Sequence, residues 1–454
     1  MNTHYLKHGP SHGQFIFDFV HTPYSDLPVW KRLIAQYSLA GFELGFQLVG
    51  FTAMCALPVM AYISVAPGVL SGIIAVWSIS EWLFLFWSKR WIEELERHRP
   101  MPCLDPKRRM VLAKKVADHV NLEKALPLWS KTSAVQDKGL PSWSIFDEQK
   151  LQPSDGSQTS VLHREACRKE SQSLEMFRPT LEPLVHKPKP LTFYVLMRGY
   201  IYMVESKLKC LGLKKYTSGN INCWKYQPAQ EAIAQPIIFI HGVGCGPGTY
   251  LSQITKLIEH HPNRNIYVLE LPCIVASTFS DIPTMDEILA SVDDFFVENS
   301  LQQCSFIGHS YGTIVCTWLN YHRPHYIADL TLVDPVCFNL FESQVLNKVS
   351  YQKPSCFAHD LFLYLIFRDP LLASIFSRNF WWHQNILFPE DIKIRTNVYI
   401  SDLDWIIDAP AIIRYLQHQL AVNPNPNISI HIIHMAHCEY IFNSDVLDAI
   451  CLNT

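Results

Sequence analysis

The stretch 304–315 constrains the fold of this chain more than any other, because a strand pattern, a sharp turn and a helix pattern follow one another there. An apolar run ends at Ile307, and an apolar helical pattern begins at Thr313. Between them, Gly308-His309-Ser310-Tyr311-Gly312 fits the Gly-x-Ser-x-Gly pattern. The apex of such a turn is strained, and side chains two positions away would clash, so glycine is expected at both. The pattern predicts that Ser310 is a nucleophile raised above a sheet, beside the first amides of a helix.

Short apolar runs alternate with helical patterns on both sides of this turn. A Thr284/Glu287 capping box, for example, opens a helix with apolar residues on one face. Alternating strands and helices indicate an α/β fold with a mostly parallel sheet covered by helices on both faces. The predicted strands besides the one before Ser310 are 237–240, 266–271, 330–333, 398–400 and 428–433.

A serine hydroxyl is a weak nucleophile and needs a base and a group that orients the base. In a fold of this kind, the acid and the histidine follow the serine along the chain. His437 lies just past the last predicted strand, and Asp404 follows the strand 398–400. Asp334 is the alternative acid, because it also ends a strand, although it could simply fix the turn at Pro335. We therefore expect Ser310, Asp404 and His437 to be catalytic.

A glycine-rich loop, His241-Gly242-Val243-Gly244-Cys245-Gly246, follows the strand 237–240. Glycines let backbone amides approach a substrate oxygen closely, so the amides of Val243 and Tyr311 are the expected donors of an oxyanion hole. A phosphate-binding loop is the alternative, but the loop lacks the terminal Gly-Lys-Ser/Thr of that motif. We expect His241 and His309 to be structural.

The interval between Asp334 and the next strand is too long for a simple crossover. It is rich in aromatic and aliphatic residues, which predicts an inserted lid at about 336–395 that lines an apolar pocket. The alternative is a structural cap whose apolar faces pack on its own core.

Two apolar runs near the N-terminus, from Leu44 and from Val69, are each about long enough to cross a bilayer as a helix. We expect a transmembrane hairpin at 38–90 after a cytosolic segment at 1–37. Basic residues flank only its outer ends, so both ends, and the domain that follows, should face the cytoplasm. A hairpin that enters one leaflet and returns, or a buried helical pair in a soluble domain, remains open. Glu81 is a polar residue that either membrane form must shelter.

A helical and linker region is expected at 91–180, followed by the α/β domain at 181–454. Asp105-Pro106 is typical of a helix start, and the basic amphipathic pattern after it could lie on an anionic membrane or pack on the domain. The polar stretch 152–159 is typical of a linker.

Composition limits the partners. There are 38 basic and 41 acidic residues, which argues against a nucleic-acid binder, and 48% hydrophobic against 17% charged residues favours membrane contact. The 13 cysteines show neither zinc-type nor disulfide-type spacing. We expect no metal and no cofactor, and a lipid bilayer and an apolar acyl ester as partners.

These motifs together resemble the α/β-hydrolase superfamily. The residues that carry the resemblance are 240–244, 308–312, 333–336, 380–382 and 401–404. More narrowly, they resemble membrane-anchored serine hydrolases of fungi and protists with unassigned substrates. The resemblance implies a serine hydrolase fold from about Pro183 to the C-terminus. Epoxide hydrolases of the same fold use an aspartate nucleophile, which Ser310 does not match.

We therefore expect a membrane-anchored hydrolase of carboxylic esters, of lipids or other apolar acyl substrates. Two alternatives stay open. One is an acyltransferase in which an alcohol replaces water, and the other is a membrane-tethered scaffold without catalysis.

Overall fold

The computed structural model describes residues 3–6, 22–63, 69–97, 99–102, 105–119, 180–228, 234–342 and 344–454. The predicted linker 152–159 and the turn at Pro67 between the two apolar runs lie outside these residues.

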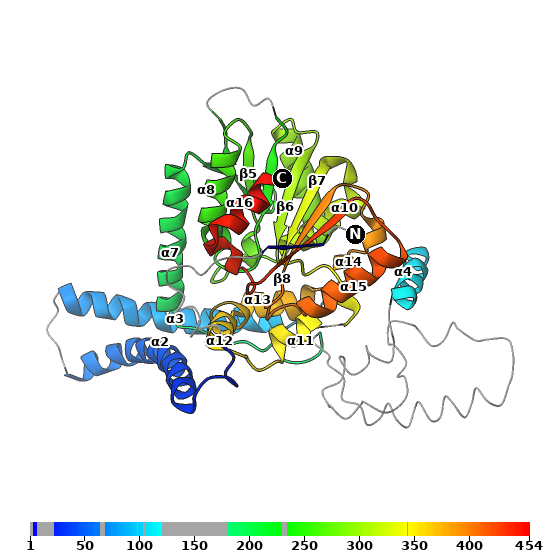
Figure 1. Cartoon of the computed structure of the whole chain (residues 1–454). Helices are drawn as coiled ribbons and strands as arrows, with labels where there is room; N and C mark the ends of the chain where they lie inside the picture. Colours follow the sequence, from blue (N-terminus) through cyan, green and yellow to red (C-terminus); the bar gives the residue numbers. More distant parts are fainter. Residues whose placement is uncertain are drawn as a thin grey trace, which may run out of the picture.

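A single nine-stranded sheet forms the centre of the molecule, with the strand order β1-β9-β8-β7-β6-β4-β5-β3-β2 (Figure 1). All neighbouring strands from β1 to β5 in this order are parallel, whereas β3 pairs antiparallel with both β5 and β2. The strands are β1 (Thr3–Leu6), β2 (Lys214–Ser218), β3 (Ile221–Tyr226), β4 (Ile237–Ile240), β5 (Ile266–Glu270), β6 (Cys304–His309), β7 (Ile327–Val333), β8 (Thr396–Ser401) and β9 (Ile428–Ile433).

Helices cover both faces of the sheet. Buried residues of α8 and α16 share one apolar cluster, and those of α9, α10 and α15 share the other. Along β4 the side chains alternate between the clusters, as the pleat requires, so this strand is buried on both faces. These helices are α8 (Leu251–His260), α9 (Met285–Glu298), α10 (Gly312–His322), α15 (Ala409–Val422) and α16 (Ser444–Leu452).

The predicted sheet covered on both faces is confirmed, and so is the Thr284/Glu287 capping box at the start of α9. The antiparallel β2–β3 pair and β1 were not predicted. These strands carry no apolar run that would mark them in the sequence. β2 is half-exposed at the edge of the sheet, and β1 pairs with β9, which lies at the other end of the chain.

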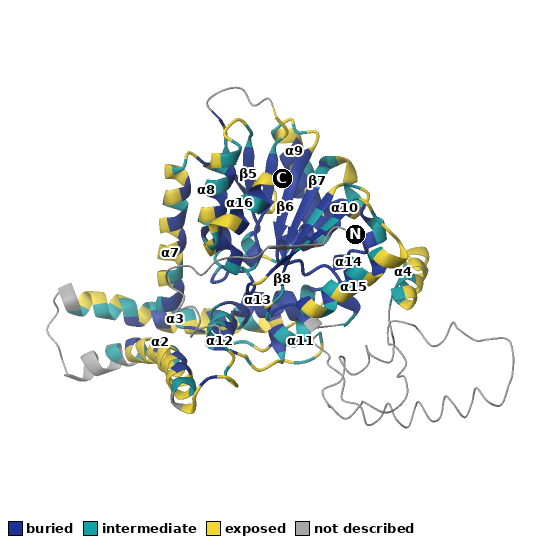
Figure 2. Ribbon diagram, viewed as in Figure 1, coloured by how far each residue is buried: buried dark blue, intermediate teal, exposed yellow. Residues whose placement is uncertain are grey.

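The apolar runs near the N-terminus form the long helices α2 (Val29–Ile63) and α3 (Val69–Glu96), which lie against each other and project from the domain (Figure 1). Among the described residues, one helical stretch, Ser71–Glu96, has the length and hydropathy that a membrane crossing needs. Much of the surface of both helices is exposed (Figure 2).

Two further helices follow the α2–α3 pair in the chain and pack against the domain. In α4 (Pro106–His119), Leu112 and Val116 pack against the core and Lys115 pairs with Asp391 at 2.6 Å. Of the two alternatives for this basic helix, the structure thus shows packing on the domain. The other helix, α7 (Leu191–Cys210), crosses the edge of the sheet.

The described residues between β7 and β8 include the short α-helices α11 (Gln344–Ser350), α12 (Phe357–Phe362), α13 (Pro370–Ser374) and α14 (Trp382–Asn385). Of these, α12 and α13 contact α2 and α3, respectively, whereas α14 contacts α10 on the other side of the domain (Figure 1).

Candidate active site

Ser310 occupies the turn between β6 and α10 and has φ = 50°, in the left-handed region that only a tightly held residue adopts. The two glycines are required by the backbone around it. A Cβ at Gly312 would lie 2.2 Å from the Ile240 carbonyl oxygen, and one at Gly308 would lie 2.7 Å from the Cys316 sulfur. The steric reason predicted for these glycines is therefore correct.

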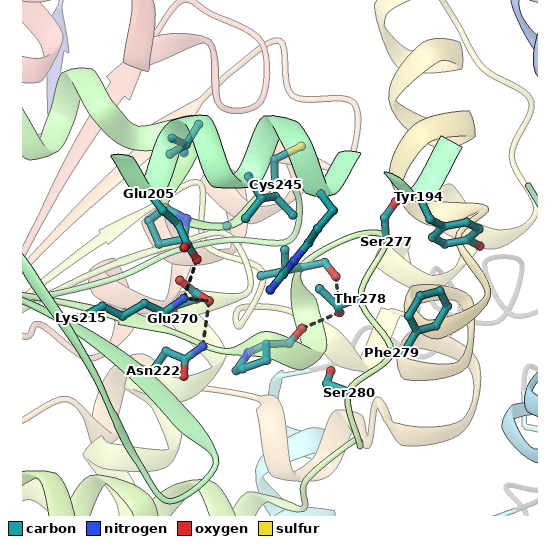
Figure 3. A pocket seen from close by; sticks show the side chains of 18 of the residues that line it. Tyr194, Glu205, Lys215, Asn222, Cys245, Glu270, Ser277, Thr278, Phe279 and Ser280 are labelled. Carbon is teal, nitrogen blue, oxygen red and sulfur yellow. Dashed lines mark hydrogen bonds and ion pairs between the residues drawn. The ribbon is translucent and has the colours of Figure 1, made fainter. Parts of the chain in front are cut away.

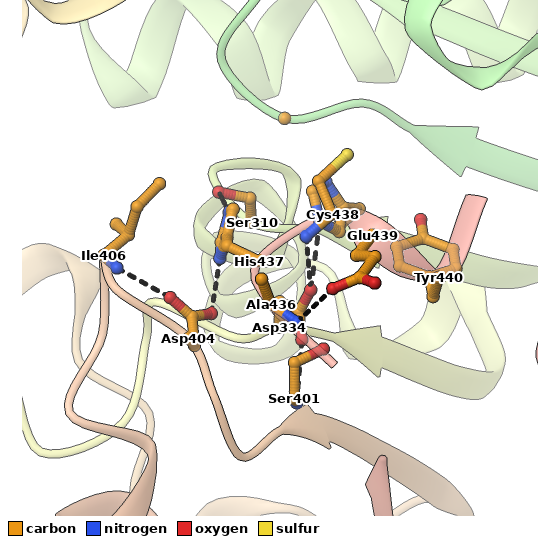
Figure 4. A network of polar contacts seen from close by, with 12 residues as sticks. Ser310, Asp334, Ser401, Asp404, Ile406, Ala436, His437, Cys438, Glu439 and Tyr440 are labelled. Carbon is orange, nitrogen blue, oxygen red and sulfur yellow. Dashed lines mark hydrogen bonds and ion pairs between the residues drawn. The ribbon is translucent and has the colours of Figure 1, made fainter. Parts of the chain in front are cut away.

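His437 lies against the serine. Its Nε2 atom is 3.0 Å from Ser310 Oγ, and its Nδ1 atom is 2.5 Å from Asp404 Oδ2 (Figure 4). The three side chains come from the ends of β6, β8 and β9, at one edge of the sheet, and all are buried. The structure thus brings together the three residues expected to be catalytic.

Asp404 is held in a fixed orientation. Its Oδ1 atom accepts hydrogen bonds from the amides of Ile406 (2.7 Å) and Ile407 (3.0 Å), which leaves Oδ2 for the His437 ring. The carboxylate can only accept, so His437 donates through Nδ1 and presents the lone pair of Nε2 to Ser310.

The two carboxylates near His437 change its proton affinity. Burial by itself lowers the pKa of His437, but the charge and hydrogen bond of Asp404, with the charge of Asp334, outweigh it and raise the pKa above its ordinary value of 6.5. The ring therefore accepts a proton more readily than a free imidazole.

Asp334, the alternative acid, has a different set of contacts. It is fully buried, has φ = 45°, and accepts hydrogen bonds from the amides of Ser401 and Cys438, both at 3.0 Å. Burial raises its pKa, but His309 at 3.5 Å, His437 and the Cys438 amide together lower it to about 2. Asp334 therefore ties the ends of β7 and β8 to the loop after β9.

The glycine-rich loop after β4 lies directly beside the serine. A Cβ at Gly242 would lie 2.8 Å from Ser310 Cβ, so only glycine fits there. Gly244 fixes the loop, since its amide donates to the Ile274 carbonyl (3.2 Å) and its carbonyl accepts from the Ala276 amide (2.7 Å). The amides of Val243 and Tyr311 donate to no other group in the part of the chain that the structure describes.

Tyr250 was not among the predicted site residues. Its hydroxyl accepts from the Gly242 amide (3.1 Å) and lies 2.7 Å from His309 Nδ1, so it supports both the glycine loop and the serine turn. The one available signal was an aromatic residue just after the glycines. His241 and His309 are structural, as expected: His241 accepts from the Leu271 amide through Nε2 and donates to the Gly242 carbonyl.

Asp334, Asp404 and His437 place their ligand atoms within 4.8 Å of one another, the spacing of a possible metal site. However, N–H groups of Ser401, Cys438, Ile406 and Ile407 point at the carboxylate oxygens. A cation would displace or repel these donors, so the group is better suited to holding the imidazole than a metal ion.

The segment 336–395 contacts the neighbours of the serine and of His437. Phe376 packs on the ring of Tyr311 at 6.1 Å, and Trp405, which packs against Phe362 at 5.0 Å, is 6.1 Å from the ring of His437. Ser310 itself is only 7% exposed. Most apolar side chains of the segment are themselves buried, so much of its apolar surface belongs to the core.

A cavity of about 520 Å³ lies on the other side of the glycine loop, between α7 and the strands β2, β3 and β5 (Figure 3). Its polar end is a closed network in which Lys215 contacts Glu205 (2.7 Å) and Glu270 (3.4 Å). Cys245 and Gly246 line it, but Ser310 is not among its described lining residues. The glycine loop thus separates this cavity from the serine.

The chain is similar to several known proteins. No protein-family model matches it. Over 142 residues it is 27% identical to the abhydrolase domain-containing protein abhd-5.2 of Caenorhabditis elegans, a match that covers 30% of this chain and 31% of the relative. The chain thus matches about a third of the length of this curated relative.

The chain is also similar to solved structures, among them an esterase, a phospholipase and an epoxide hydrolase. One is the naproxen esterase of Bacillus subtilis, at 13% identity over 56% of this chain and 96% of the esterase, with a TM-score of 0.38. Another is a bacterial membrane phospholipase A, at 16% identity over 66% of this chain and 100% of the phospholipase, with a TM-score of 0.39. A third is an epoxide hydrolase of Vigna radiata, at 13% identity over 53% and 97%, with a TM-score of 0.38.

Proposed function

The chain belongs to the α/β-hydrolase superfamily, and on this premise we propose that it is a membrane-associated serine hydrolase that cleaves carboxylic esters of apolar, lipid-like acyl groups. One observation carries the proposal: His437 bridges Ser310 Oγ at 3.0 Å and Asp404 Oδ2 at 2.5 Å. The nucleophile thus lies within hydrogen-bond distance of the base, and the base lies within hydrogen-bond distance of the acid that orients it.

In the first half of the reaction, Ser310 Oγ attacks the ester carbonyl carbon while His437 Nε2 takes the hydroxyl proton. The tetrahedral intermediate collapses, the bond from the carbonyl carbon to the alcohol oxygen breaks, and His437 returns the proton to the leaving alcohol. Asp404 stabilises the imidazolium that forms between these steps. In the second half, water attacks the acyl-enzyme by the same route and releases the carboxylic acid.

The negative oxygen of the tetrahedral intermediate needs fixed donors. The amides of Val243 and Tyr311, which donate to no other described group, are the proposed pair. These amides are already oriented before the reaction, so no dipoles have to reorient when negative charge develops on the carbonyl oxygen. The close fit of Gly242 against Ser310 supports this role for the loop.

Two features support an apolar substrate. The segment 336–395, which we propose to act as a lid, packs Phe376 on the ring of Tyr311 and Phe362 on Trp405, which follows β8 and lies beside His437. The same segment contacts the α2–α3 pair, through Tyr364 against Phe42 (6.2 Å) and Ser374 to the Leu95 carbonyl (2.9 Å). The proposed lid thus lies against the helices that lead to the proposed membrane attachment.

Labelling with a fluorophosphonate tests the nucleophile. We expect the wild type to be labelled and Ser310→Ala to be unlabelled, because the probe must bond to Oγ. His437→Ala should lose about as much activity as Ser310→Ala, with little further loss in the double variant, since the residues act as a unit. Circular dichroism confirms that each variant is folded.

Equal labelling of the wild type and Ser310→Ala, or no labelling of a folded wild type, would contradict Ser310 as the nucleophile. Either result would favour the alternative of a scaffold without catalysis. Product analysis with a lipid ester, with and without an added alcohol, separates hydrolysis from acyl transfer. Hydrolysis predicts free acid as the main product in both conditions.

A further inference from the structure

The position of Glu81 in α3 decides how much of the hairpin is free to enter a membrane. Glu81 is only 3% exposed, although it lies inside the apolar run. Its carboxylate accepts from the amides of Leu191 (2.9 Å) and Thr192 (3.0 Å) and from the Thr192 hydroxyl (2.7 Å). It thus caps the N-terminus of α7, where a negative charge is favourable. A charged group in such a network belongs at the level of the domain and not in hydrocarbon.

Contacts of α2 show which of its turns lies beside Glu81 of α3. Trp82 donates to the carbonyl of Met54 at 2.9 Å, which sets Met54 of α2 beside the Glu81 turn of α3. A Cβ at Gly50 would lie 2.6 Å from Pro190, so α2 touches the start of α7 as well. Both helices are therefore bound to the domain up to this level, and only their distal arms project beyond it.

The projecting arms are short. At 1.5 Å per residue, α2 extends about 14 Å beyond Met54, and α3 extends about 18 Å from Glu81 back to its first residue. The hydrocarbon core of a bilayer is about 30 Å thick, and one leaflet accounts for half of it. The sequence carries no charged residue between Glu43 and Glu81. The arms therefore match the depth of one leaflet and not of two.

The outer face of α7 is also apolar. Val195, Leu196, Tyr202 and Met203 are between 59% and 68% exposed, and their spacing places them on one side of the helix (Figure 2). Lys207 and Lys209 stand exposed in its last turn. Since α7 begins at the Glu81 cap and runs crosswise to α3, it lies in the plane at which the arms leave the domain (Figure 1).

We propose that the α2–α3 hairpin enters one leaflet and returns without crossing the membrane, and that the outer face of α7 rests on the surface of the same leaflet. This inference rests on the membrane association proposed above and specifies its form. The apolar face of α7 meets the acyl boundary and its lysines meet anionic headgroups. Two points of attachment fix the orientation of the domain on the membrane.

Glycosylation mapping tests the depth of the hairpin. A long hydrophilic loop with an Asn-x-Thr acceptor is inserted between Ala66 and Pro67 of the full chain, which is then synthesised with sealed endoplasmic-reticulum microsomes. The matched control carries about eight extra leucines in each arm, which lengthens each by about 12 Å and allows a full crossing. We expect the control to be glycosylated and the natural-length hairpin to remain unmodified while resisting carbonate extraction.

Glycosylation of the natural-length hairpin would overturn the inference, because the loop would then have reached the lumen. Release by carbonate without glycosylation would also overturn it, because a hairpin embedded in a leaflet resists extraction. Either result leaves fluorophosphonate labelling of Ser310 unaffected, so a failure here is distinguishable from a failure of the proposed chemistry.

Cysteine accessibility tests the α7 face in the full chain with exposed Cys210 replaced by serine. Met203→Cys is compared with Val297→Cys, which is 77% exposed on the distant helix α9. In vesicles of phosphatidylcholine and phosphatidylserine, we expect a membrane-impermeant maleimide to label Met203→Cys about tenfold more slowly than Val297→Cys, with equal labelling after unfolding. Equal rates in vesicles would show that this face is in water and would overturn its part of the proposal.

Discussion

At the scale of single residues, two buried aspartates lie beside the same histidine and have separate tasks. Asp404 contacts the His437 ring directly, at 2.5 Å, and is oriented by two amides. Asp334 accepts from two other amides and connects three loops at the edge of the sheet. Both carboxylates favour the protonated imidazole, but only Asp404 is placed to fix its tautomer.

Replacing each aspartate by asparagine separates these tasks. Asp404→Asn should lower kcat by about 10³- to 10⁴-fold with little loss of stability, because the ring loses its orienting acceptor. Asp334→Asn should keep most of the activity of the folded enzyme but cost about 1–3 kcal/mol of stability, since an amide cannot accept both N–H groups. Kinetics with a soluble ester and thermal unfolding measure the two effects. The reverse pattern would make Asp334 the catalytic acid.

The pH dependence of the reaction follows from His437. Acylation needs the neutral ring, and the neighbouring carboxylates hold its pKa above 6.5. The value of kcat/KM should therefore rise with pH through a midpoint above 6.5, and Asp334→Asn should move this midpoint to lower pH by removing one negative charge. A pH profile of both proteins measures the shift, and a midpoint below 6.5 in the wild type would contradict the assigned environment.

At the scale of elements, the turn between β6 and α10 depends on the neighbouring strand. Gly312 approaches the end of β4 so closely that a methyl group would overlap the Ile240 carbonyl. The strained apex at Ser310 is maintained because β4, β6 and the glycine loop after β4 are packed together. The serine turn and the glycine loop are therefore one structural unit.

A single methyl group tests this unit. Gly312→Ala should destabilise the protein by about 1–3 kcal/mol or more and reduce activity, because a backbone carbonyl cannot give way as a side chain can. Gly199→Ala, in α7, is the matched control, since a Cβ there meets nothing within 4 Å and alanine favours a helix. Thermal unfolding measures the stability of both variants, and equal stability would contradict the close contact at Gly312.

At the scale of the whole molecule, part of the proposed lid lies between the sheet edge that holds Ser310, Asp404 and His437 and the two long helices. The helices α12 and α13 contact α2 and α3, respectively. Phe84 and Trp87 of α3 pack on Phe279, which follows β5. The site is therefore close to the part of the two long helices that is bound to the domain, and these helices lead from it to the arms proposed to enter a membrane.

The orientation of the whole chain can be tested in sealed microsomes. Basic residues flank only the outer ends of the hairpin, so we expect the domain to face the cytoplasm. Protease added outside should digest the domain without detergent, while a lumenal marker protein stays intact. Protection of the domain would show the opposite orientation.

The local patterns of the sequence determined the α/β character of the chain, the serine turn, the glycine loop and the positions of the predicted strands. These features depend on neighbours a few residues apart, and they follow from glycine geometry and apolar periodicity. The candidate residues Ser310, Asp404 and His437 could be chosen because the ends of parallel strands meet at one edge of the sheet.

Only the tertiary structure decided which of the two aspartates contacts the histidine, since Asp334 and Asp404 both end strands and differ only in what lies opposite them. It also revealed Tyr250 and the cap that Glu81 provides for α7, which join residues far apart in the chain. The apolar runs specified two long helices. How far these helices project depends on which of their turns are bound to the domain, because a contact between distant segments leaves no periodic signal in either one.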